Sequence, residues 1–215
     1  KFLLIKNFFL KYSITLKPTD FISVAFFLLL IFINLIFHTE VTHWVSFVIF
    51  NLLTIILILF ISYKDYINQN HFWRLTHYWF LVPLILFSFK QMYFLIHPIR
   101  KLDYDFLLIE IDRFLFGTDP TLFIIQFAHP FVTEILQIVY GTFYFLPIIL
   151  CLDLYLNKKY YEVDYATFLI VYGFFISYLA YFIFPAIGPR FTLHNFENIN
   201  NDLPGIFLTN HLREL

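Results

Sequence analysis

The chain has 215 residues, of which 60% are hydrophobic and only 13% are charged, and its formal net charge at pH 7 is −1. A soluble domain of this composition could not cover its surface with polar groups, and the balanced charge gives no electrostatic basis for nucleic-acid binding. The single Cys151 excludes an internal disulfide. The sequence therefore predicts an all-α integral membrane protein, a polytopic transmembrane helix bundle with about five spans.

The first 20 residues carry four lysines among apolar residues and are predicted to lie at the membrane interface as a lead-in to the first span. Crossing ~30 Å of hydrocarbon takes roughly 17 to 25 apolar residues. Five runs meet this length, and the predicted spans are 21–37, 44–62, 78–96, 131–156 and 167–184. Thr19 and Asp20 are candidates for capping the first span, and Pro185 is expected to close the fifth.

Residues 100–130 form the longest connection, between the third and fourth spans. Its segment 105–116 is apolar but is interrupted by four charged residues, so it is too short and too charged to span. We predict a helix that lies in the interface or packs on the bundle and ends at Gly117. Asp119 and Pro120 then begin another short helix, with proline in its first turn.

The distribution of lysine and arginine predicts the orientation. A cytoplasmic N-terminus places eight of these residues in inner segments and five in outer ones, which agrees with the positive-inside rule. Residues 100–130 and 185–215 would then face outward. The sequence predicts one membrane domain over residues 1–215, multi-pass in a plasma or inner membrane.

The outer end of the fifth span, YFIFPAIGPR at residues 181–190, gives the strongest local signal. Pro185, Gly188 and Pro189 break the helix there and free backbone groups near the membrane surface. Arg190 follows, and its guanidinium offers a fixed fork of donors that matches a phosphate or a carboxylate. The alternative is an arginine that only reaches toward lipid headgroups.

Polar residues inside the fourth span give a second signal. Glu134, Gln137, Gly141 and Tyr144 recur at intervals of three and four, so they share one helix face. Ionisable groups in membranes usually face the bundle interior. A pair between Lys90 and Glu134 would join two spans, or the shared face would line a polar cavity beside the arginine described above.

The sequence predicts no metal and no cofactor. The carboxylates of residues 103–119 lack the spacing of a calcium loop, and neither HExxH nor CxxC occurs. No nucleophile elbow or P-loop is present. His97, His129 and His194 fall on the predicted outer side, where each is more often an interfacial polar residue than a catalytic base.

Three segments resemble the type 2 phosphatidic acid phosphatase superfamily: YDFLLIEIDRFLFGTDPT at 104–121, LQIVYGTFYFLPIIL at 136–150 and YFIFPAIGPRFTLHNF at 181–196. The nearest branch is similar to inositol phosphorylceramide synthases. LPGIFLTNHLREL at 203–215 resembles the stretch that precedes the catalytic motif in such proteins. The resemblance covers roughly residues 103–215.

The resemblance implies a six-span enzyme that hydrolyses or transfers phosphate groups of membrane lipids at the outer surface, through a phosphohistidine and without a metal. Arg190 would bind the substrate phosphate. The residues expected to line the site are Lys90, Glu134, Tyr140, Tyr144, Gly188, Pro189 and His194. The lipid, the acceptor and the oligomeric state remain open.

The sequence also departs from the family pattern. Ile183 stands where the first motif usually has lysine, and neither the Ser-Gly-His motif nor the later His-plus-Asp motif occurs. The nucleophile and a sixth span are therefore expected beyond Leu215, and this chain alone is expected to be an inactive N-terminal part. The alternative function is a non-catalytic transporter or channel subunit in which Lys90, Glu134 and Arg190 line a polar path.

Overall fold

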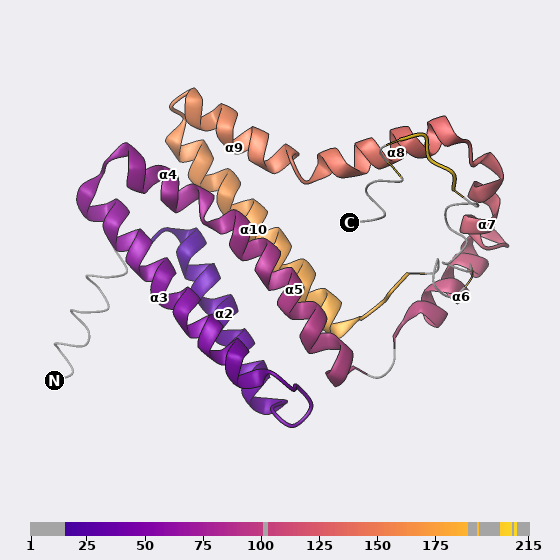
Figure 1. Ribbon diagram of the computed structural model, residues 1–215, viewed down its shortest axis with the longest axis horizontal. Helices are drawn as coiled ribbons and strands as arrows, with labels where there is room; N and C mark the ends of the chain where they lie inside the picture. Colours follow the sequence, from indigo (N-terminus) through magenta and orange to yellow (C-terminus); the bar gives the residue numbers. More distant parts are fainter. Residues whose placement is uncertain (1–15, 101–102, 189–192, 194–202, 208, 210–215) are drawn as a thin grey trace. The chain divides into compact units, whose positions relative to one another are not determined.

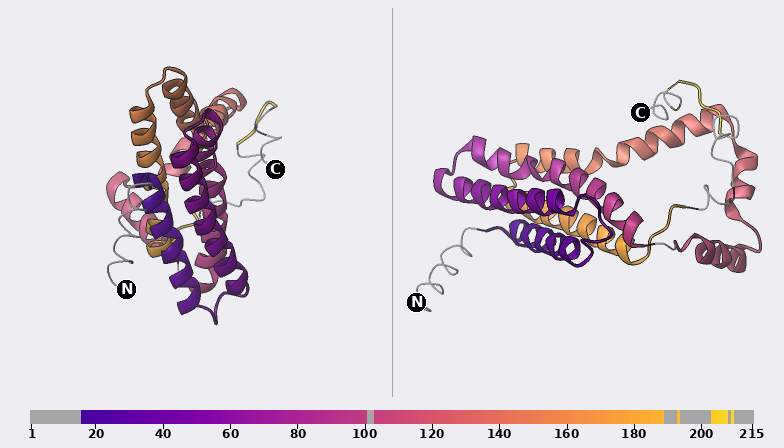
Figure 2. Two further views of the ribbon diagram at one scale, coloured as in Figure 1. Left: turned by 90° about the vertical axis from the view of Figure 1, so that its left-hand side faces the viewer. Right: turned by 60° about the horizontal axis from the view of Figure 1, so that its bottom comes forward.

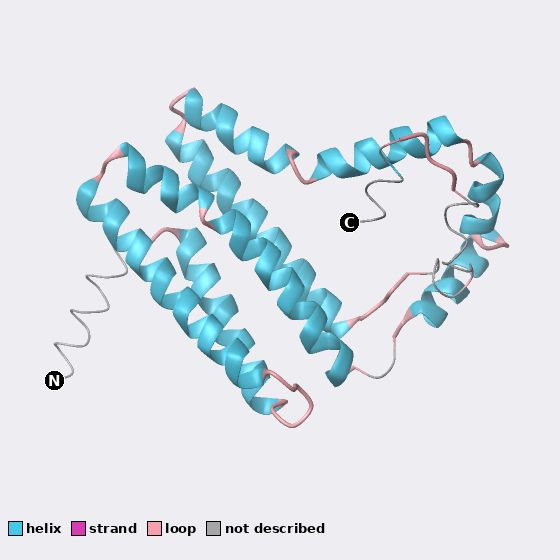
Figure 3. Ribbon diagram, in the orientation of Figure 1, coloured by secondary structure: helices cyan, strands magenta, loops and turns pink. Residues whose placement is uncertain are grey.

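The computed structural model describes residues 16–100, 103–188, 193, 203–207 and 209. In this part of the chain the regular elements are all helices, which confirms the predicted fold class (Figure 3). The chain divides into two compact units. Unit 1 comprises Lys1–Lys101 and Leu154–Ile183, and unit 2 comprises Leu102–Asp153 and Phe184–Leu215. The single membrane domain expected over the whole chain stays a prediction.

Unit 1 is a bundle built mainly of long apolar helices (Figures 1 and 2). Its helices are α2 (Pro18–Ile36), α3 (Trp44–Asn68), α4 (His71–Trp79), α5 (Leu81–Ile99) and α10 (Tyr160–Ile183). Helix α2 packs against α3 and α10, and α10 also packs against α5. Buried apolar side chains of α2, α3, α5 and α10 form the hydrophobic core of this bundle.

Helix α2 shows how the sequence builds this bundle. Pro18 occupies its first turn, where a missing N–H costs nothing, and Asp20 accepts a hydrogen bond from the backbone N–H of Lys17 at 2.9 Å. Phe26 and Phe27 point into the core, where the Phe26 ring stacks on that of Phe175 with centroids 4.0 Å apart. The opposite face of α2 exposes apolar side chains, as a lipid-facing surface requires.

Among the residues that the structure describes, four stretches are long and apolar enough to cross a membrane: Pro18–Ile36, Trp44–Asn68, His71–Ile99 and Tyr160–Ile183. A fifth is possible if Pro120–Phe127 and Pro130–Phe143, which meet at 118°, form one broken span. The four or five candidates agree with the predicted number of about five. The third candidate is longer than expected because α4 precedes α5, and because α5 continues through Pro98.

The predicted fourth span, 131–156, is wrong as a continuous helix. The structure has α8 (Pro130–Phe143) and α9 (Leu146–Leu156), separated by a turn. Pro147 explains the break, because it has no N–H to bond to the carbonyl of Phe143 and its ring would collide with that carbonyl in a continuous helix.

The remaining helices of unit 2 are α6 (Asp105–Phe116) and α7 (Pro120–Ile124), followed by the 3-10 turn η1 (Ile125–Phe127). The predicted helix 105–116 is therefore confirmed, as is the helix that begins after Asp119. The Arg113 Nε donates to Asp119 Oδ1 at 2.7 Å, and this bond raises the pKa of the exposed guanidinium. The bond holds the end of α6 to the start of α7.

Gly117 ends α6 with a φ of +70°, a conformation that an L side chain adopts only with strain. We expect Gly117→Ala to lower the free energy of unfolding by about 1 kcal/mol. Gly141→Ala is the matched control, because Gly141 lies inside α8 with nothing within 4 Å of an added Cβ. This control is expected to be neutral or stabilising. Denaturant titration in detergent measures both, and equal effects would contradict the prediction.

Candidate functional site

A buried carboxylate in unit 2 fixes the segment that leads to the predicted phosphate-binding arginine. Asp105, the first residue of α6, is 1% exposed. Its two oxygens accept hydrogen bonds from the backbone N–H groups of Ile187, at 3.2 Å, and Gly188, at 3.0 Å. The backbone N–H of Tyr104 donates to the carbonyl of Pro185 at 2.8 Å. Three bonds thus hold Pro185–Gly188 against the start of α6.

The local sequence explains this contact. Pro185 lies just beyond the end of α10 and has no N–H to continue the helix, so the chain leaves in an extended form. Gly188 has a φ of +111°, which favours glycine, and its N–H turns toward Asp105. An acidic residue in the first turn of α6 is also favoured by the helix dipole. Gly188, a predicted site residue, therefore has a defined structural role.

Glu134 of α8 fixes a second segment of unit 2. Its Oε2 accepts the Thr209 hydroxyl at 2.8 Å and the backbone N–H groups of Ile206, Phe207 and Thr209 at 3.0 to 3.4 Å. Gly205 permits this turn, because a Cβ there would lie 2.4 Å from the Cβ of Thr209. The carboxylate that was predicted to line the site thus anchors backbone donors far along the chain.

The other predicted residues are distributed as follows. Tyr140 and Tyr144 are exposed at the end of α8, with their hydroxyl oxygens 3.3 Å apart. Lys90 is exposed on α5 of unit 1, whereas Glu134 belongs to unit 2, and a pair between them stays a prediction. Pro189, Arg190 and His194 lie outside the described residues.

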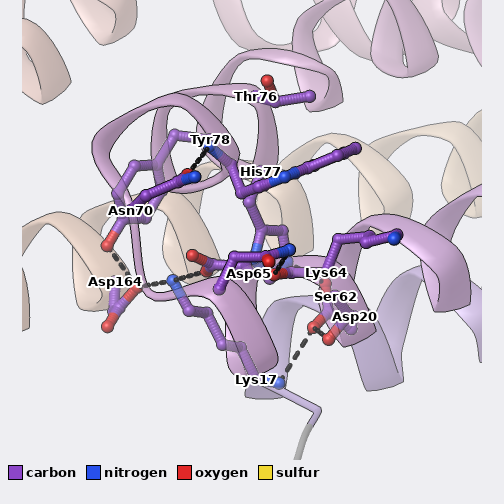
Figure 4. Close-up of polar contacts among 12 residues, drawn as sticks. Lys17, Asp20, Ser62, Lys64, Asp65, Asn70, Thr76, His77, Tyr78 and Asp164 are labelled. Carbon is purple, nitrogen blue, oxygen red and sulfur yellow. Dashed lines mark hydrogen bonds and ion pairs between the residues drawn. The ribbon is translucent and has the colours of Figure 1, made fainter.

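Sequence reasoning missed a cluster of charged side chains inside unit 1 (Figure 4). His77 of α4 is 2% exposed. Its Nε2 lies 2.8 Å from Asp20 Oδ1 of α2, and its Nδ1 lies 2.8 Å from Asp65 Oδ2 of α3. The hydroxyl of Ser62 donates to Asp20 Oδ2 at 2.9 Å. One imidazole therefore links three helices.

The cluster extends to α10 through Lys17. The Lys17 Nζ lies 2.9 Å from Asp164 Oδ1 and 3.5 Å from Asp65 Oδ2. The Tyr78 hydroxyl donates to Asp164 at 2.8 Å, and Lys17 Nζ lies 4.3 Å from the centre of the Tyr78 ring. A signal was available in the sequence, because ionisable residues near the ends of apolar runs are costly unless they are paired.

Comparison with known proteins supports the resemblance stated above. Residues 107–209 match the model of the PAP2 superfamily. No curated protein and no solved structure matches the chain. The match confirms the predicted resemblance to this superfamily over residues 107–209, whereas the branch similar to inositol phosphorylceramide synthases stays a prediction. The segment that begins in α6, includes α8 and α10 and ends at Thr209 is therefore similar to the PAP2 superfamily.

Proposed function

We propose that the protein is a membrane-embedded enzyme that removes or transfers phosphate groups of membrane lipids by phosphohistidine chemistry at the outer membrane face. The PAP2 superfamily match supports phosphatase-type chemistry. The long apolar helices support a substrate that lies in the bilayer. No cofactor is needed, because a histidine nucleophile with an acid–base partner carries out both steps of such a reaction.

The observation that supports this proposal most directly is the pair of hydrogen bonds from the backbone N–H groups of Ile187 and Gly188 to the carboxylate of Asp105. Arg190 follows Gly188 by only two residues in the sequence. A phosphate-binding arginine acts best when the backbone that carries it is fixed in advance, because the site then needs no reorganisation during reaction. The proposal gives Arg190 the role of donating to the phosphoryl oxygens and gives Asp105 the role of positioning that segment.

The function is tested with the full-length gene product in vesicles that contain phosphatidic acid. Release of inorganic phosphate supports a phosphatase. Transfer of a labelled phosphate-bearing headgroup from a phospholipid to an added polyol supports a phosphotransferase. If neither reaction occurs and ions or solutes instead cross the vesicle membrane, the transporter or channel alternative would replace the proposal.

Asp105→Ala tests the positioning role in the same assay. The loss of both backbone contacts is expected to lower kcat/KM by about tenfold or more, because small displacements of a binding group are costly. Asp103→Ala is the matched control, since Asp103 is an exposed carboxylate two residues earlier. Thermal unfolding of both variants separates lost positioning from lost folding. Equal kcat/KM in the two folded variants would contradict the role of Asp105.

A further inference from the structure

The charged cluster of unit 1 has a geometry that fixes where its protons lie (Figure 4). His77 lies between Asp20 and Asp65, and each ring nitrogen is 2.8 Å from a carboxylate oxygen. A neutral imidazole carries only one N–H, so its other nitrogen presents a lone pair. A lone pair cannot bond to an ionised carboxylate oxygen at that distance.

The oxygens of Asp20 are placed as hydrogen-bond acceptors. Asp20 is fully buried, and its Oδ2 accepts the Ser62 hydroxyl at 2.9 Å and the backbone N–H of Lys17 at 2.9 Å. Both groups are donors, so that oxygen has no need of a proton of its own. The remaining oxygen, Oδ1, faces His77. Asp20 is thus satisfied when the histidine donates to it.

Asp65 is held as an acceptor in the same way. Its Oδ2 lies 3.5 Å from the ammonium of Lys17 and 2.8 Å from Nδ1 of His77. An ammonium has donors and no acceptor, so it favours the charged carboxylate. Both carboxylates therefore require a donor from the imidazole, and only the imidazolium form supplies two.

We propose that Asp20, His77 and Asp65 form a buried proton-binding site, in which one proton taken from the aqueous phase is held on His77 as an imidazolium. The proton is the ligand, and the products of its release are a neutral histidine and a proton in water. Among the described residues, no group of three histidine, cysteine or acidic side chains has the arrangement that would hold a metal ion.

The charges around the site favour the same assignment. The cluster contains three carboxylates, which are Asp20 and Asp65 beside His77 and Asp164 of α10. The ammonium of Lys17 supplies one positive charge. A neutral histidine would leave two negative charges uncompensated within the cluster, whereas an imidazolium leaves one. On α4 itself, Tyr78 donates to Asp164, and Arg74 lies over the ring of Tyr160 at 4.8 Å.

The bound proton joins helices that are otherwise separate along the chain. The Asp20 and His77 side chains come from α2 and α4, and Asp65 comes from α3. Loss of the proton would break one of the two bonds of His77 and leave a buried lone pair opposite a buried charge, which costs more than an absent bond. The site therefore makes the packing of these three helices depend on pH.

Nitrogen-15 NMR of histidine-labelled protein in detergent tests the site directly. We expect His77 to show two protonated ring nitrogens at about pH 7.5, where an ordinary histidine is mostly neutral. His77→Gln identifies the signal by its loss, and His38→Gln is the matched control, because His38 lies outside the cluster. A single-tautomer, neutral His77 signal at that pH would overturn the proposal.

The dependence of the unfolding temperature on pH gives a second readout. A histidine with a purely structural role would not alter this dependence. Above about pH 6.5 the unfolded histidine is mostly neutral, so folding must take up a proton and stability must fall as the pH rises. We expect the Tm of the wild type to decrease from about pH 6 to about pH 9 more steeply than that of His77→Gln. Parallel profiles of Tm against pH for the wild type and His77→Gln would contradict the proton-binding site. Neither the NMR nor the unfolding measurement depends on the proposed enzymatic function.

Discussion

Replacing Arg190 by alanine in the full-length protein is expected to lower the turnover of a lipid phosphate by about 100-fold or more. The reason is the charge on the phosphoryl oxygens, which increases in the transition state and loses its fixed pair of donors. Arg190→Lys should recover part of the rate, because it restores the charge without the planar fork. The measurement is the initial rate of phosphate release or headgroup transfer in vesicles.

Lys159→Ala is the control for this experiment. Lys159 is an exposed cation next to the start of α10, and the proposed site does not include it. Its removal tests whether a general loss of positive charge weakens binding to an anionic membrane. If Arg190→Ala and Lys159→Ala both have the same kinetics as the wild type, the phosphate-binding role of Arg190 is contradicted, and contact with lipid headgroups is the role that fits.

Replacing Asp20 by alanine is expected to lower the free energy of unfolding by about 3 to 5 kcal/mol. The substitution removes the acceptor for His77, Ser62 and the N–H of Lys17 together, and it leaves a buried cationic ring with one partner instead of two. Few single substitutions in this chain should cost as much, because such large losses arise mainly from buried networks and cavities.

Denaturant titration in detergent measures this effect. Glu162→Ala is the control, since Glu162 is an exposed acid in the first turn of α10 and its loss should change stability by no more than about 0.5 kcal/mol. Asp20→Asn should have an intermediate effect, because an amide can still accept from Ser62. A stability of Asp20→Ala within the range of the control would show that the cluster contributes nothing to folding.

The apolar runs predicted where the long helices of unit 1 lie, because hydropathy is a local property, but the helices at the third and fifth predicted spans begin seven residues earlier than predicted. The bounds of α6 were equally predictable, since Gly117 and Asp119 are local stop and start signals. The break between α8 and α9 was missed, although Pro147 marks it, because the apolar run continues across the proline.

The polar partners were not predictable in the same way. His77 and Asp20 are 57 residues apart, and only the packing of α2 against its neighbours brings them together. Glu134 was expected either to pair with Lys90 or to line a polar cavity, and neither expectation pointed to its donors among the backbone amides between Ile206 and Thr209. Backbone donors are present at almost every residue, so a sequence does not show which of them a carboxylate will meet.

The length of α3 has a consequence for the membrane in which the protein works. Its 25 residues rise about 37 Å, several ångströms more than the ~30 Å of a typical hydrocarbon core. Asp65 lies in the last turns of that helix, so in a bilayer of that thickness the surplus length would place this end of the helix near the headgroup layer. A thicker bilayer would draw that carboxylate into oil, and a thinner one would bring it closer to water. Bilayer thickness and sterol content thus become variables that tune how readily the charged end of this bundle exchanges protons.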